Sequence, residues 1–485
     1  MRIVFINPPF KFRISRASRW PEHTKSGTLY YPFWLAYAAG YAEKNGHEVL
    51  LLDAIANDWS AEETISRVAE FKPQLAVVDT SLPSIRSDVQ FAKELKAADA
   101  DVKVCLVGTF PSARPQYTMS ISPAIDFIAR KEYDETIVDL ANTLEAKANN
   151  RDISRVLGIT HFDGGKIKST PDRQYIDNLD VFPYVSKIYK RFLNPQHYRY
   201  ALARHPMIQI MSARGCNNMC VFCNVPQTFM SRHFRMRSAE DLVDEMQWIR
   251  ENMPEIKEIF IDDDTMTVDK NRVREVCRLI KDRNLKVVWS TNARTDISLD
   301  VLKEMKSAGC RMLIVGYESG NQKILQNIKK GITLKQAEKF TKDAKEAGIK
   351  IFGCFMIGLP GDTKETIRQT IEWAKKLKPD MIQIEQIVPF PGTEFYDWAK
   401  QRGYLKTEDP DKWLDETGQL GFLIDYPNLH AEELKKMRDK LTIEFYTDPR
   451  QMLRIVANNL HPREFVRLAK ASKDYLAYLL KKKVS

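Results

Sequence analysis

An alternation of strands and helices in the second half of the chain limits its fold the most. Between residues 207 and 393, six short apolar runs are each followed by a polar loop and a helical stretch. Strands joined through helices lie parallel, so six such units predict a partial (β/α)6 barrel that is open enough to admit a substrate. Side chains at the carboxyl ends of these strands therefore meet at one mouth of the barrel.

A cysteine motif follows the first of these strands. Cys216, Cys220 and Cys223 have the spacing C-x3-C-x2-C, in a chain of 485 residues with seven cysteines. Thiolates are soft ligands for iron or zinc, and a [4Fe–4S] cluster normally takes four of them. Three thiolates leave one iron open to an outside ligand. The alternatives are a structural zinc site without its fourth ligand, or three unrelated thiols.

The first 148 residues show a second βα alternation. Its strands are continuous apolar runs, which indicates an open parallel sheet of the Rossmann or flavodoxin type. Such sheets bind ligands at the carboxyl ends of their strands. The loops expected to form a site follow Ile6, Val78, Val107 and Ala129. A nucleotide-binding or empty Rossmann-like domain is the alternative.

Taken together, these features resemble the cobalamin-binding (class B) radical S-adenosylmethionine (SAM) enzymes. Phe222, just before the last cysteine, completes the loop signature of radical SAM proteins. Tyr31–Ala36 and Ile443–Pro449 are similar to segments of one subgroup. That subgroup contains the anaerobic magnesium-protoporphyrin cyclase and the radical SAM enzymes of hopanoid synthesis.

The resemblance implies a [4Fe–4S] cluster on the three cysteines and SAM on its open iron. The carboxylates of Asp262 and Asp263 suit the SAM amino group, because an ammonium donates charge-assisted hydrogen bonds. Glu318 suits the ribose hydroxyls, and Arg294 suits the SAM carboxylate. The residues expected to bind SAM are Phe222, Asp262, Asp263, Arg294, Glu318 and Ser319.

The same resemblance implies cobalamin on the N-terminal sheet. Lys131 stands where the family has a glycine before its glutamate, and a single Gly108 stands where many relatives have two. The histidine motif D-x-H-x-x-G is absent from the sequence, so cobalamin is expected without a histidine as its lower ligand. The residues expected to contact it are Asn7, Pro8, Thr80, Ser81, Leu82, Gly108, Thr109 and Glu132.

These features predict an α/β chain made of four parts. A mainly helical C-terminal region is expected to cap the barrel and shape the substrate pocket. The expected parts are a Rossmann-like cobalamin-binding domain at 1–148, a linker at 149–205, the radical SAM barrel at 206–398 and the C-terminal region at 399–485.

As for activity, the resemblance implies a methyltransferase. A 5′-deoxyadenosyl radical would remove hydrogen from an unactivated carbon, and methylcobalamin would deliver the methyl group. One alternative is a cyclase, ring-contracting or other non-methylating enzyme that acts on a tetrapyrrole or a lipid. Another is a cobalamin-free radical SAM enzyme whose N-terminal domain only recognises a partner. No residue is assigned as a general acid or base.

The net charge of +10 is diffuse, and no nucleic-acid-binding motif is present, so a solvated basic face explains it. The protein is expected to be a monomer in the cytoplasm and to act under anaerobic conditions. Contact with a membrane surface is neither expected nor excluded. Its expected partners are a one-electron reductant of the flavodoxin or ferredoxin type and a substrate. The substrate is a lipid, a tetrapyrrole or a peptide in a partner protein.

Overall fold

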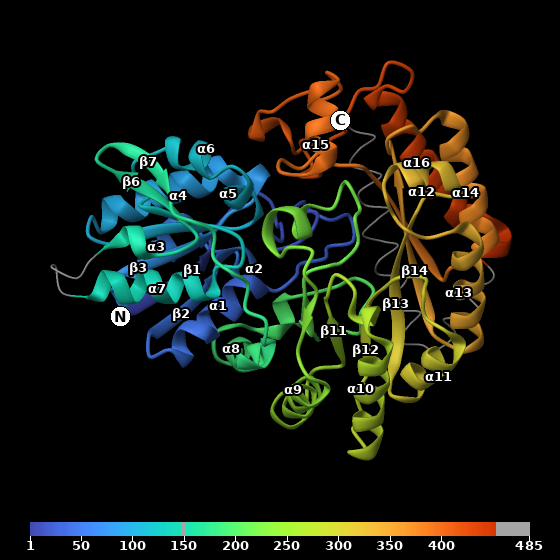
Figure 1. Ribbon diagram of the computed structural model, residues 1–485, viewed down its shortest axis with the longest axis horizontal. Helices are drawn as coiled ribbons and strands as arrows, with labels where there is room; N and C mark the ends of the chain where they lie inside the picture. Colours follow the sequence, from blue (N-terminus) through green and yellow to red (C-terminus); the bar gives the residue numbers. More distant parts are fainter. Residues whose placement is uncertain (147–151, 453–485) are drawn as a thin grey trace.

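A computed structural model describes residues 1–146 and 152–452 of the chain. Two sheets lie side by side with helices around them (Figure 1). The first sheet belongs to the N-terminal part, the second to the barrel, and the C-terminal residues lie against the barrel. The expected α/β architecture, with a Rossmann-like domain before a partial barrel, is confirmed.

The N-terminal sheet has the strand order β2-β1-β3-β4-β5-β6-β7, and its first five strands in this order are parallel. These strands are buried apolar runs, which explains why a parallel sheet forms here. Their bounds are β1 Arg2–Asn7, β2 Glu48–Asp53, β3 Leu75–Asp79, β4 Lys103–Val107 and β5 Phe127–Ala129.

Helices cover this sheet on both faces, in the manner of a doubly wound fold. The Ser60 side chain and Glu63 form a capping box at the start of α3, which satisfies backbone donors there. The helices are α1 Phe33–Lys44, α2 Ala54–Asn57, α3 Ala61–Phe71, α4 Ile85–Ala98, α5 Thr109–Ala113, α6 Pro115–Ser120 and α7 Asp134–Glu145.

A hairpin extends the sheet beyond the expected boundary at residue 148. Strands β6 (Ile159–Asp163) and β7 (Lys166–Ser169) are antiparallel, and β6 pairs with β5. The turn between them holds Gly164 and Gly165, both with positive φ, as this hairpin requires. Part of the segment assigned to the linker is therefore part of the first domain, because β5 otherwise leaves an open edge.

The second sheet has the order β15-β14-β13-β12-β11-β8, and every pair is parallel. A short ribbon of β9 (Ala213–Arg214) and β10 (Arg235–Met236) lies beside it. The strands are β8 Met207–Ile210, β11 Glu258–Ile261, β12 Trp289–Ala293, β13 Cys310–Glu318, β14 Lys350–Ile357 and β15 Met381–Gln386.

Helices on the outside of the barrel alternate with these strands. Side-chain oxygens cap several of them, for example Asp269 at α10 and Thr333 at α13. The helices are α9 Ala239–Asn252, α10 Lys270–Asp282, α11 Leu299–Ser307, α12 Gln322–Asn327, α13 Leu334–Glu346 and α14 Lys364–Leu377.

The C-terminal region is only partly helical over the residues described. Helices α15 (Glu394–Gln401) and α16 (Ala431–Thr447) flank an irregular stretch that holds three isolated β-bridges. Residues 453–485, where further helix is expected, lie outside the described residues. Along 1–146 and 152–452, no helix is both long and apolar enough to cross a membrane.

Helix α1 joins the two domains. It is buried along most of its length and packs on the first sheet, on α7 and on α8 (Val185–Phe192). Trp34 lies 4.7 Å from Phe229, a barrel residue, measured between ring centroids. The Tyr37 hydroxyl reaches the barrel backbone at Met211. One continuous apolar core therefore runs from the first sheet into the barrel and fixes how they face each other.

Candidate active site

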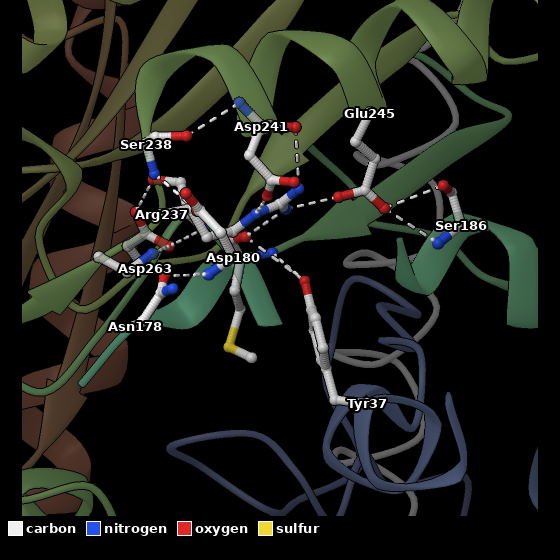
Figure 2. Close-up of polar contacts among 12 residues, drawn as sticks. Tyr37, Asn178, Asp180, Ser186, Arg237, Ser238, Asp241, Glu245 and Asp263 are labelled. Atoms are coloured by element: carbon white, nitrogen blue, oxygen red, sulfur yellow. Dashed lines mark hydrogen bonds and ion pairs between the residues drawn. The ribbon is translucent and has the colours of Figure 1, made fainter. Parts of the chain in front are cut away.

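The loop that carries the three cysteines is held at its start by a buried polar network (Figure 2). The Asp263 carboxylate accepts hydrogen bonds from the backbone amides of Ser212, at 2.6 Å, and Ala213, at 3.0 Å. The Ser212 hydroxyl donates to the same carboxylate. Burial raises the pKa of Asp263 to about 6, and the Ser212 hydrogen bonds oppose that shift. The carboxylate therefore acts as an anchor for the loop.

Arg237 holds the preceding residue. Its guanidinium donates to the Met211 carbonyl at 3.0 Å and forms ion pairs with Asp241 and Glu245, both at 2.5 Å. The Met211 amide donates to the Tyr37 hydroxyl at 2.9 Å, so helix α1 contributes to the same network. Arg237 and Glu245 are almost fully buried, Asp241 is partly exposed, and the three charges satisfy one another, which rigidifies the entry to the cysteine loop.

The three cysteines lie on one loop and are all free thiols. Cys220 is buried, and Cys216 and Cys223 are half-buried. Burial and the nearby Asp264 raise the pKa of the Cys223 thiol. Within the described part of the chain, no three cysteine, histidine or acidic side chains converge closely enough to bind a metal ion. The donor set still fits an iron–sulfur cluster, because three soft ligands share one short, anchored loop.

At the end of β11, two aspartates point to the barrel mouth and one points away. Asp262 accepts from Gln209 at 2.7 Å and from Asn292 at 2.8 Å, and it also pairs with Arg19. Asp264 pairs with the same arginine at 2.8 Å. Successive side chains of an extended chain point to opposite sides. Asp264, rather than the expected Asp263, therefore lies beside Asp262.

Glu318 lies at a β-bulge at the end of β13, with a positive φ of 63°. Its carboxylate forms a buried ion pair with Lys330 at 2.6 Å. Gly316 leaves room for this pair, since a Cβ there would lie 2.4 Å from the Glu318 carboxylate. Arg294 donates to the Lys330 carbonyl, so Arg294, Glu318 and Lys330 lie together at the mouth.

The other two residues expected near SAM have different surroundings. The Ser319 side chain is buried and lies 3.2 Å from the Thr370 hydroxyl of α14. It also accepts from the Asn321 amide, which gives it a structural role. Phe222 is buried next to Cys223, with 8% of its surface exposed.

The residues expected to contact cobalamin gather at the carboxyl edge of the first sheet. Asn7 donates to Asp53 at 2.8 Å, which ties the ends of β1 and β2 together. The Ser81 hydroxyl lies 2.8 Å from that of Ser84 in the turn after β3. Gly108 has φ 123°, and a Cβ there would lie 2.2 Å from the Thr80 carbonyl. This backbone approach requires glycine.

Three buried polar atoms at this edge have no partner among the described residues: the Asp79 carboxylate Oδ2, the Thr80 hydroxyl and the Tyr133 hydroxyl. Buried polar groups are normally hydrogen-bonded, so such a group indicates a missing ligand or water. Burial raises the pKa of Asp79 to about 7. Unsatisfied donors and acceptors at the ligand-binding edge of a parallel sheet fit a large polar cofactor such as cobalamin.

Glu132 follows β5 and binds barrel residues. Its carboxylate accepts from Arg214 at 3.1 Å and from Arg235. Arg214 also pairs with Asp134 at 2.6 Å. Glu132 thus connects the first domain to the start of the cysteine loop, and its cobalamin contact stays a prediction.

A narrow cleft, with a free volume of only about 10 Å³, lies between the two edges. One wall comes from the turns after β3 and β4, and the other from the loop after the cysteines and the loop after β15. The lining residues are Pro21, Leu82, Thr109, Phe110, Asn224, Thr228, Phe390 and Pro391. The two expected cofactor edges therefore face each other across a short gap.

Comparison with known proteins identifies the families of the two domains. A family model described as the radical SAM superfamily matches residues 210–374, and one described as a B12 binding domain matches residues 23–141. An uncharacterized methyltransferase of Pyrococcus horikoshii is 30% identical over 455 residues, which cover 94% of each chain. The chain belongs to the cobalamin-dependent radical SAM methyltransferase family.

The chain is also similar to a cyclase and to a solved methyltransferase structure. The anaerobic magnesium-protoporphyrin IX monomethyl ester cyclase of Rubrivivax gelatinosus is 26% identical over 82% of this chain and 69% of that protein. The solved structure of the radical SAM methyltransferase TsrM from Kitasatospora setae, with cobalamin and a [4Fe-4S] cluster bound, superposes with a TM-score of 0.71. It covers 99% of each chain at 15% identity. Membership in this family confirms the expected set of cofactors: the cluster, SAM and cobalamin.

Sequence reasoning missed several residues that lie at the barrel mouth and at the edge of the first sheet. Lys330 and Arg19 come from loops whose path cannot be read from periodicity. Asp264 could have been predicted, since residues 262 and 264 are two apart in an extended segment and their side chains point to the same side. Tyr133 follows Glu132 directly, yet a tyrosine at a helix start carries no signal of its own.

Proposed function

We propose that this protein transfers a methyl group to an unactivated carbon atom of its substrate. One observation supports the proposal most: the sheet edge with unsatisfied polar atoms faces the mouth with the cysteine loop across one cleft. When bound, the cluster and SAM supply a hydrogen-abstracting radical, and cobalamin supplies the methyl group. A substrate bound between these two edges, after the narrow cleft widens, would be within reach of both.

The chain's own residues would bind and orient these groups. Cys216, Cys220 and Cys223 would hold the cluster. Asp262 would accept hydrogen bonds from the SAM amino group. Glu318 would accept hydrogen bonds from the ribose hydroxyls, either beside its ion pair with Lys330 or after Lys330 moves away. The buried ion pairs around Arg214 and Glu132 would keep the two edges at a fixed separation.

Around the cobalamin, Asp79, Thr80 and Tyr133 would supply the polar contacts, and Gly108 would let the backbone come close. Leu82 and Thr109 line the cleft on the same side. The apolar aromatic wall at Phe110 and Phe390 would exclude water from the reacting carbon.

Radical SAM enzymes need an external one-electron reductant. We infer a carrier of the flavodoxin or ferredoxin type that approaches the cysteine loop, where Met219 is 51% exposed between two of the cysteines. We further infer a monomer that works in the cytoplasm, on a lipid, a tetrapyrrole or a peptide of a partner protein.

Product analysis tests the proposal. The protein is reconstituted anaerobically with iron, sulfide and hydroxocobalamin, then given SAM and a chemical reductant. We expect both S-adenosylhomocysteine and 5′-deoxyadenosine. 5′-Deoxyadenosine without S-adenosylhomocysteine would favour a cyclase, the activity named for the Rubrivivax relative. A protein that binds no cobalamin would contradict both.

A further inference from the structure

The segment between β1 and α1, residues 8–32, crosses from one cofactor edge to the other. It forms no helix or sheet strand of its own, and we call it the strap. Long loops without secondary structure in a compact domain are usually functional. Its residues Trp20 and Pro21 contact the cleft region, with Trp20 6.3 Å from Phe390 between ring centroids.

In its first half the strap is bound through Arg16 to the carboxyl edge of the first sheet, where cobalamin is expected. This side chain is fully buried. Its guanidinium donates to the Asn7 amide oxygen at 2.7 Å, the Pro8 carbonyl at 2.8 Å and the Asp88 carboxylate at 2.6 Å. A further bond at 3.2 Å reaches Ser84, in the turn after β3. Arg16 therefore ties together two of the loops that are expected to surround cobalamin.

Three residues later the strap contacts the barrel mouth, where SAM is expected, through Arg19. The guanidinium donates to Asp262 at 3.1 Å and to Asp264 at 2.8 Å. The second oxygen of Asp264 is buried and has no hydrogen-bond partner among the residues described. A cation from the N-terminal domain thus sets the orientation of both mouth aspartates.

The two arginines are close along the chain. Three residues of extended backbone span at most about 11 Å. Both side chains are pinned by several charge-assisted bonds, which are strong and directional. A change in the loops around Pro8 and Ser84 is therefore carried to Asp262 and Asp264 through a short, doubly anchored segment.

We propose that Arg19 is a positioning residue of the SAM site that the N-terminal domain supplies, and that through Arg16 it makes SAM affinity depend on bound cobalamin. Cobalamin at the sheet edge fixes the loops that hold Arg16. Arg19 and the two aspartates then keep the arrangement that SAM requires, and a ligand that restricts a segment lowers the entropic cost of binding the next one. This inference rests on the proposed function.

The test measures SAM binding to cluster-loaded protein, with and without hydroxocobalamin, by equilibrium dialysis. We expect bound cobalamin to lower the Kd for SAM of the wild type by about fivefold or more. Arg19→Met should lose this dependence and bind SAM about tenfold more weakly when cobalamin is present. Arg19→Lys should recover part of both effects, because it restores the cation.

Arg13→Met is the matched control, because Arg13 lies on the same strap but is half-exposed and pairs with Asp58 at 3.2 Å. It should behave as the wild type. If Arg19→Met does not fold, Asp264→Asn breaks the same contact from the barrel side and takes its place.

A wild type that binds both cofactors without any cobalamin effect on SAM would overturn this inference and leave the proposed function intact. So would an R19M protein that keeps the effect, or an R13M protein that loses it equally. A wild type that binds no cobalamin would overturn both proposals.

Discussion

Arg214 and Glu132 join the two cofactor edges directly, with the Arg214 guanidinium 3.1 Å from the Glu132 carboxylate. Arg214 lies two residues before the first cluster cysteine, and Glu132 follows the last parallel strand of the first sheet. Both side chains are almost fully buried. Charge-assisted bonds between buried groups are geometrically demanding. This pair therefore helps to set how the barrel faces the cobalamin domain.

We expect Glu132→Gln to lower the free energy of unfolding by about 3 kcal/mol, because it leaves the buried cations Arg214 and Arg235 short of a carboxylate. Urea denaturation followed by circular dichroism measures it. Glu43→Gln is the control, since Glu43 forms an exposed ion pair with Arg191 at 2.7 Å and should cost less than about 1 kcal/mol. Equal losses in the two variants would contradict the role given to Glu132.

Gly108→Ala should impair both folding and cobalamin retention. Its new Cβ would lie 2.2 Å from the Thr80 carbonyl, so the turns after β3 and β4 must separate. Gly46→Ala is the control that separates backbone strain from steric overlap. Gly46 also has a positive φ, but a Cβ there would meet no other atom. It should cost about 1–2 kcal/mol and leave cobalamin binding unchanged. Thermal unfolding and the absorbance of retained cobalamin test both expectations.

Asp79→Asn should flatten the pH dependence of stability in the cobalamin-free protein. Burial raises the pKa of Asp79 to about 7, from 3.8. Its contribution is fully present below the unfolded pKa and is lost as pH rises through about 7. At pH 8 the variant should therefore be more stable than the wild type, by on the order of 2–4 kcal/mol. Parallel profiles from pH 4 to 8 would show that Asp79 is not the group responsible.

Cys220→Ala should abolish the cluster. One of three ligands on an anchored loop is then missing, and the remaining two do not hold the iron. Iron analysis and the absorbance of the reconstituted protein measure the loss. Cys277→Ala is the control, because Cys277 is a buried thiol of α10 outside the loop, and it should keep wild-type iron. A loss of iron in both would mean that the substitutions act through folding.

Much of this architecture could be predicted from the sequence, because apolar strand runs and the cysteine spacing are local signals. The six β/α units of the barrel and the cysteine loop after β8 both follow from them. The end of β11 shows the limit. Three consecutive aspartates look equivalent in sequence, but Asp263 turns inward to Ser212 while Asp262 and Asp264 face the mouth.

Contacts between distant segments were beyond sequence reasoning. The strap shows no periodicity, so nothing in residues 8–32 predicts that Arg16 and Arg19 reach different domains. The β6–β7 hairpin lies in the segment expected to be a linker, and its pairing with β5 depends on which edge of the sheet is open. Glu132 was placed correctly after a strand, yet its partners Arg214 and Arg235 lie 82 and 103 residues away.

The most direct test of the central claim is the fate of SAM on the fully loaded protein. The chain, with cluster and cobalamin bound, is reduced anaerobically in the presence of SAM, and the products are quantified while the cobalamin spectrum is recorded. We predict 5′-deoxyadenosine together with at least one equivalent of S-adenosylhomocysteine per bound cobalamin, and a spectrum that changes as methyl groups are taken up. 5′-Deoxyadenosine alone, with an unchanged cobalamin spectrum, would contradict the account.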